Sequence, residues 1–201
     1  MVSTQKHIKS WVNVYQYAQT VTGYCIGKKL MKPINIRLTA EEVSNCDKAA
    51  AFRWQLARAS NVINQRKDGN RNDEDIDLLG IKAEMAVANL LDCKYSPFEF
   101  GVDTGTDFFL GNISIDVKST FYKTGKLLFK SKDYFKADCS VLVSSTNDDN
   151  VMSVVGYSSK KHFLENCVPE NLGHGQCVTL KQDQLKPMEN LWRYHVVNKF
   201  K

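Results

Sequence analysis

The chain has 201 residues, of which 43% are hydrophobic and 24% charged, and its formal net charge is +5. A chain of this length can bury a substantial core, and these fractions are those of an ordinary globular protein. No apolar run is long enough to cross a bilayer, and the first residues lack the pattern of a signal peptide. These features argue against a membrane or exported protein, so we expect a cytoplasmic one.

The net charge is concentrated in the first part of the chain. Residues 1–76 contain 12 Lys and Arg against 7 Asp and Glu, whereas residues 77–201 contain 15 of each kind. A polar stretch at 65–75 separates the two parts and has the composition of an exposed linker. We therefore predict a basic N-terminal extension over 1–76 and a second domain over 77–201.

The predicted extension contains a strand and a long helix. Residues 11–17 alternate like a strand but are also compatible with a helix, whereas 34–38 favour a strand. Thr39 followed by Glu42 is a capping-box signature, which predicts a helix that begins there and runs toward Asn64.

Glu84 is the first candidate site residue. Residues 77–92 have the three- and four-residue apolar spacing of a helix. On a helical wheel Lys82 and Asn89 lie opposite Glu84, and it is surrounded by apolar or small residues: Gly80, Ile81, Val87, Ala88 and Leu91. Burial of an unpaired carboxylate is costly, so an inward glutamate should have a metal, a cation or a proton as its partner. The alternative is a rim glutamate whose carboxylate bends out to water.

Residues 106–119 predict a tight hairpin with two carboxylates and a lysine on one face. The Gly-Asn pair at 111–112 is a two-residue turn signal between two β-favouring runs. The register set by this turn places Asp107 opposite Asp116, with the two Cβ atoms about 5 Å apart, and Lys118 on the same face as Asp116. Directly opposed carboxylates repel, and a divalent cation such as Mg²⁺ would relieve that repulsion. An ordinary solvated strand face is the alternative.

The rest of the chain adds further strands and one helix. The sequence predicts a helix from about 159 to 166 and strands at 126–130, 139–145, 152–157 and 177–180. Strands mixed with helices in this way indicate the α/β class.

Together these residues resemble the PD-(D/E)XK nuclease superfamily, and in particular its small phage-encoded members. The resemblance covers roughly 77–191, and it is carried by Gly80 and Glu84 on a helix, Asp107, the run Asp116-Val117-Lys118 and the apolar runs 137–143 and 154–157. Thr106 stands where the motif has its proline, which is not a ligand. The resemblance implies a restriction-endonuclease-like core, with a mixed four-stranded sheet flanked by helices, and metal-dependent hydrolysis of phosphodiester bonds in nucleic acid.

The resemblance also implies a role for each matched residue. Asp107 and Asp116 would bind Mg²⁺ or Mn²⁺, with the backbone carbonyl of Val117 as a further ligand. Glu84 would bind through water or hold a second ion. Lys118 would orient or activate the attacking water and offset charge on the phosphate. The chain would then be a deoxyribonuclease, working in the host cell cytoplasm if a phage encodes it.

Cations outside an acidic pocket are needed to hold a polyanion such as DNA. Arg53 and Arg58 lie on the predicted long helix, and Lys123 and Lys126 lie among the aromatic residues of 120–136. These four residues are the candidates for substrate binding. The alternative is that the charges form solvated faces and the aromatic residues belong to the core.

Two classes of function remain open at this point. One is a metal-dependent DNA nuclease, and the other is a catalytically inactive nucleic-acid-binding or regulatory protein on a nuclease-like fold. A structural phage component is a third interpretation. The sequence does not decide between DNA and RNA, between single and double strands, or between a monomer and a homodimer.

Overall fold

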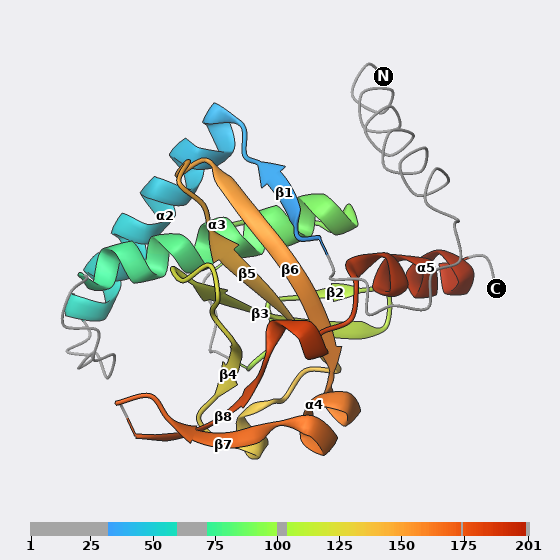
Figure 1. Ribbon diagram of the computed structural model, residues 1–201. Coiled ribbons are helices and arrows are strands. Elements are labelled where there is room, and N and C mark those ends of the chain that lie inside the picture. The colour runs from blue at the N-terminus through green and yellow to red at the C-terminus, as the bar shows by residue number, and fades with distance from the viewer. Residues whose placement is uncertain (1–31, 60–71, 100–103, 174, 200–201) are drawn as a thin grey trace. The chain divides into compact units, whose positions relative to one another are not determined.

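The structure is a computed structural model, and it describes residues 32–59, 72–99, 104–173 and 175–199 (Figure 1). Three predicted segments lie outside these residues: the element at 11–17, the end of the long helix at 60–64 and the first part of the linker. Residues 31–201 form one compact unit. No described helix has the length and apolar character needed to cross a membrane.

A five-stranded mixed sheet forms the centre of this unit. Its strands are β1 (Ile34–Arg37), β2 (Phe108–Leu110), β3 (Ile113–Thr120), β5 (Cys139–Ser145) and β6 (Val151–Ser159). They lie in the order β1-β6-β5-β3-β2, with β3 and β5 parallel and all other neighbours antiparallel. The α/β class is confirmed. Strands β2, β3, β5 and β6 of this sheet follow residue 77, and β1 pairs with β6 as a fifth strand. The restriction-endonuclease-like core stays a prediction.

Two helices are stacked on one face of this sheet. Helix α3 (Asp73–Leu91) packs on the strands, and α2 (Ala40–Ala59) packs on α3 (Figure 1). Helix α2 begins with the predicted capping box, in which Glu42 donates its amide to Thr39 Oγ1 and Thr39 donates its amide to Glu42 Oε2. The described part of the predicted extension thus belongs to the same unit as the residues after 76.

The assignment of 73–75 to an exposed linker is wrong. These three acidic residues form the first turn of α3, and Asn72 caps the helix by accepting the amide of Asp75 at 2.7 Å. An asparagine cap and negative charge both stabilise a helix N-terminus, because they satisfy its free amides and complement its dipole.

A small antiparallel sheet and helix α4 (Lys160–Asn166) complete the fold. The small sheet has the order β4-β8-β7, with β4 (Leu127–Phe129), β7 (Val168–Asn171) and β8 (Gln176–Leu180). Phe129, Phe135 and Phe163 pack against one another with ring centres 4.6–5.2 Å apart, in a buried cluster that also includes residues of β5 and β6. Strand β7 and helix α5 (Met188–Lys199) were not predicted.

Candidate active site

The β2–β3 hairpin has the predicted register. Phe108 lies opposite Ile115, and Asp107 is the next residue toward the N-terminus. The carboxylate of Asp107 turns toward β3, where the amide of Val117 donates to its Oδ2 at 2.6 Å. Asp107 precedes the first residue of β2, and this bond holds its side chain next to β3, the strand that carries Asp116.

Asp116 is buried on β3, and each of its carboxylate oxygens has a donor. The ammonium of Lys118, two residues further along the same face, lies 2.5 Å from Oδ1. The hydroxyl of Ser140 donates to Oδ2 at 2.9 Å. Ser140 is fully buried and lies directly opposite Asp116 on the parallel strand β5. Lys118 also lies over the ring of Phe129, at 5.2 Å from its centre.

Glu84 reaches this region from α3. Its side chain is only 14% exposed, so the predicted inward orientation is confirmed. Tyr95, in the segment after α3, donates its hydroxyl to Glu84 Oε2 at 2.6 Å. The guanidinium of Arg53, from α2, lies 3.9 Å from the same oxygen. A buried glutamate thus has one hydrogen-bond donor and one nearby cation.

The charges of these residues act on one another. Burial raises the pKa of Asp107 to about 7, and the negative charge of Glu84 is the second cause of this shift. The hydrogen bond from the Val117 amide lowers the pKa but does not cancel these effects. Asp107 is exposed as a residue, yet its carboxylate faces β3, which explains the effect of burial. Burial also raises the pKa of Glu84, while the Tyr95 hydroxyl lowers it. Neighbouring carboxylates with raised pKa values are typical of functional sites.

The arrangement can be compared with what a metal ion requires. Carboxylate oxygens are the ligands that Mg²⁺ and Mn²⁺ prefer, so the residue types fit. In the described part of the chain, however, no group of three or more His, Cys, Asp or Glu side chains is arranged to hold a metal ion. In this conformation Lys118 and Ser140 occupy the two oxygens of Asp116. The ligand set of Asp107, Asp116, the Val117 carbonyl and Glu84 stays a prediction.

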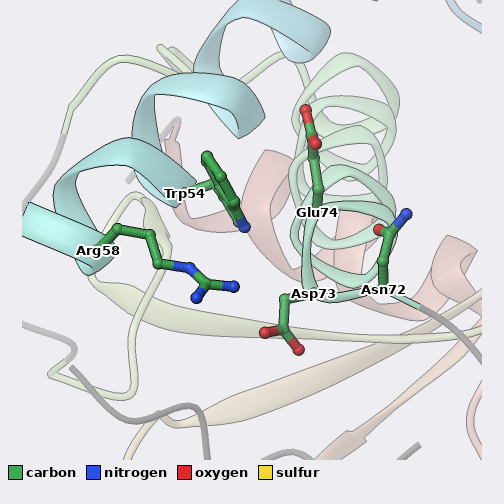
Figure 2. A pocket seen from close by; sticks show the side chains of 5 residues that line it. All are labelled: Trp54, Arg58, Asn72, Asp73 and Glu74. Atoms are coloured by element: carbon green, nitrogen blue, oxygen red, sulfur yellow. The ribbon is translucent and has the colours of Figure 1, made fainter. Parts of the chain in front are cut away.

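Two of the predicted substrate contacts lie on α2 in different surroundings. Arg53 faces the acidic site through Glu84. Arg58 stacks over Trp54, 5.0 Å from the ring centre, at a surface hollow of about 450 Å³ whose other lining residues are Asn72, Asp73 and Glu74. Figure 2 shows Arg58 reaching toward Asp73 across this hollow. The hollow does not include the acidic site.

The other two predicted contacts lie beside β4. Lys126 donates to Glu170 of β7 at 2.5 Å, so its charge is paired within the protein. Lys123 is exposed in the connection between β3 and β4. Of the aromatic residues in 120–136, Phe129 and Phe135 belong to the core, whereas Tyr122 and Tyr134 are exposed.

Two residues that contact the acidic site were missed by the sequence analysis. Tyr95 lies in an irregular segment, and nothing in the local sequence indicates that it binds Glu84. The sequence gives a weak indication that Ser140 has a buried partner, because Ser140 is a polar residue near the start of an apolar run in a predicted strand. A buried polar side chain normally has a hydrogen-bond partner, and here the partner is Asp116.

A scan against protein-family models, a search of curated proteins and a search of solved structures found no match to this chain. The resemblance to the PD-(D/E)XK superfamily therefore stays a prediction from the residues.

Proposed function

We propose that this protein is a metal-dependent nuclease that hydrolyses phosphodiester bonds in DNA. The observation that supports the proposal is the gathering of Glu84 from α3, Asp107 from the start of the hairpin, and Asp116 and Lys118 from β3. Their charges influence one another, as the raised pKa values of Asp107 and Glu84 indicate. Three carboxylates and one ammonium, held together by α3 and the β2–β3 hairpin, are a costly arrangement for a purely structural role.

Asp107 and Asp116 would hold Mg²⁺ or Mn²⁺, together with the backbone carbonyl of Val117, and Glu84 would contribute through water. Such an ion supplies Lewis acidity and lowers the pKa of a bound water. Burial first, and the negative charge of Glu84 second, raise the pKa of Asp107 to about 7, and a divalent ion would offset both the repulsion and the loss of hydration. Residue types and electrostatics thus favour a divalent ion over an empty site.

Lys118 would stabilise the charge that develops during hydrolysis. In this reaction a water oxygen bonds to phosphorus while the bond from phosphorus to the leaving sugar oxygen breaks. The water loses a proton and the leaving oxygen gains one. Negative charge grows on the non-bridging oxygens, and an ammonium fixed beside them stabilises that charge more than it stabilises the ground state. The contacts of Lys118 with Asp116 and the ring of Phe129 restrict where its ammonium lies.

One observation favours the second candidate, a nucleic-acid-binding or regulatory protein without catalytic activity. Asp116 is already satisfied by Lys118 and Ser140, so this part of the site is stable without a metal ion. A site of this kind would bind nucleic acid through the surrounding cations while its acidic residues served only to fix the hairpin.

The two functions are separated by measuring cleavage and metal binding together. Linear, circular and branched DNA would each be incubated with the protein in Mg²⁺, Mn²⁺ or EDTA, and Mn²⁺ binding would be measured by calorimetry. We expect cleavage with either ion, none in EDTA, and Mn²⁺ binding that is lost in Asp116→Asn. DNA binding without cleavage, and with no measurable Mn²⁺ binding, would instead support the inactive protein.

A further inference from the structure

Phe109 is the most exposed large hydrophobic side chain among the described residues, at 64%. It lies in the middle of β2, where Phe108 and Leu110 on either side are buried. Side chains alternate between the two faces of a strand, so residues two apart share a face. Phe109 therefore shares its face with Asp107, and the buried residues beside it point into the core.

The register of the hairpin places Phe109 next to the acidic site. Phe109 lies opposite Ser114 on β3, and Asp116 is two residues further along the same face of β3. A two-residue step along a strand covers about 6.6 Å, a distance comparable to one nucleotide of an extended nucleic acid strand. A strand whose phosphate lay at Asp107 and Asp116 would thus bring a neighbouring base close to the ring of Phe109.

The backbone opposite Phe109 is held in place by hydrogen bonds. The hydroxyl and amide of Ser114 donate to Asp138 Oδ2 at 2.7 and 2.9 Å. The amide of Lys160 donates to the carbonyl of Asp138 at 2.8 Å. The ammonium of Lys160 lies 3.5 Å from the carbonyl oxygen of Lys136. Ser114, the partner of Phe109, is thus held in place, and Lys160 belongs to the same hydrogen-bonded network through Asp138. An exposed aromatic ring on a fixed backbone is suited to stacking with a base.

We propose that Phe109 is a stacking position for an unpaired nucleobase beside the acidic site, and that the preferred substrate is single-stranded nucleic acid or an unpaired end. This inference rests on the proposed function and specifies its substrate. Inside a duplex both faces of a base are covered by its neighbours, so a base must leave the stack to meet a protein ring. In a single strand each base offers a face, and stacking on an aromatic ring tolerates any sequence.

A second copy of this chain is the competing occupant of the same surface. Strand β2 is at the edge of the sheet, and an exposed apolar edge strand can pair with another such strand. The position of Phe109 favours the nucleic acid, because it lies a two-residue step from Asp107, where the proposed function places a phosphate held by a divalent ion. The oligomeric state of the wild type and of Phe109→Ala distinguishes the two occupants.

The test compares binding of oligothymidylate with binding of a blunt-ended duplex, both in EDTA so that nothing is cleaved. Fluorescence anisotropy would be measured for the wild type, Phe109→Ala, Phe109→Tyr and the control Leu172→Ala. Leu172 is also an exposed apolar residue, at 50%, but it follows β7 in the small sheet. We expect Phe109→Ala to bind oligothymidylate about tenfold more weakly, with Phe109→Tyr and Leu172→Ala close to the wild type and duplex binding alike in all four proteins.

The same samples would show whether the inference fails. Equal oligothymidylate affinity in the wild type and Phe109→Ala overturns it, as does a wild type that prefers the duplex. A wild-type dimer that Phe109→Ala converts to a monomer in sedimentation would assign the surface to a second copy and also overturn it. Because Phe109 is exposed, thermal unfolding of each variant should match the wild type, which excludes a folding defect as the cause of weaker binding.

Cleavage in Mg²⁺ separates this inference from the proposed function. Binding that depends on Phe109 without any cleavage would support the stacking position and refute the nuclease. Cleavage of single strands at the wild-type rate and affinity in Phe109→Ala would leave the nuclease standing and refute the stacking position.

Discussion

Replacing Ser140 by alanine should lower both the stability of the protein and its affinity for a divalent ion. Ser140 is fully buried and donates to the carboxylate of Asp116 at 2.9 Å. A hydrogen bond to a charged group contributes about 1.5–3 kcal/mol. We therefore expect the free energy of unfolding to fall by about 2 kcal/mol, which lowers the unfolding midpoint by about 4–8 °C for a chain of this size. Because Ser140 also orients Asp116, the affinity for Mn²⁺ should fall about tenfold.

Ser158 provides a matched control for this prediction. It lies opposite Ser140 on the neighbouring strand β6, is also fully buried, and donates to the carbonyl of Ser159 at 3.1 Å. Ser158→Ala loses a bond to a neutral acceptor, so it should cost about 1 kcal/mol and leave Mn²⁺ binding unchanged. Thermal unfolding in EDTA and calorimetry with Mn²⁺ measure both quantities. If the two variants lose equal stability and keep equal Mn²⁺ affinity, Ser140 does not position Asp116.

Three further predictions concern the charged residues. Lys118→Ala should lower the rate of single-turnover cleavage on the order of 10²-fold. It should also tighten Mn²⁺ binding, because the Lys118 ammonium no longer competes for a carboxylate oxygen of Asp116. Full cleavage activity in this variant would contradict the assigned role of Lys118. The pKa of Asp107 is raised to about 7. Between about pH 4 and about pH 7 the Asp107 carboxyl is therefore ionised in the unfolded state but still protonated in the folded state. The free energy of unfolding in EDTA should fall as pH rises through that window. Asp107→Asn should flatten this slope in thermal unfolding, and an unchanged slope would show that another group is responsible. Arg58→Ala should flatten the salt dependence of DNA binding by roughly one unit of slope. Arg53→Ala removes a cation beside a buried carboxylate, so it should mainly lower the unfolding midpoint. The reverse pattern would exchange the roles of the two arginines.

The hairpin was predictable because its geometry is decided locally. A two-residue turn fixes which residues face each other, and strand alternation then fixes the faces. The predicted pairing of Phe108 with Ile115 is confirmed, and with it the shared face of Asp116 and Lys118. The capping box at Thr39 was predictable for the same reason, since it involves only residues three apart.

Contacts between distant segments were not predictable from the same rules. Ser140 meets Asp116 through the parallel pairing of β3 with β5, and no turn sets the register of parallel strands. Tyr95 meets Glu84 through an irregular segment. Lys82, on the side of α3 away from Glu84, is buried because Asp47 of α2 and the carbonyl of Asp149 lie against it. A helical wheel cannot show that a second helix covers the polar side.

The position of α2 changes what the charge distribution means. In the sequence, the excess of cations in 1–76 suggested a basic extension that binds the substrate, beside a charge-balanced domain whose acidic pocket cleaves it. In the structure, α2 packs on α3, and this packing brings Arg53 within 3.9 Å of Glu84. The cation lowers the pKa of Glu84 and so offsets part of the desolvation that raises it. At least one charge of the basic segment therefore acts inside the acidic site, where it reduces the cost of holding three carboxylates close together. Arg58, one and a half turns further along α2, faces the hollow instead, so the same helix both stabilises the site and presents a cation outside it.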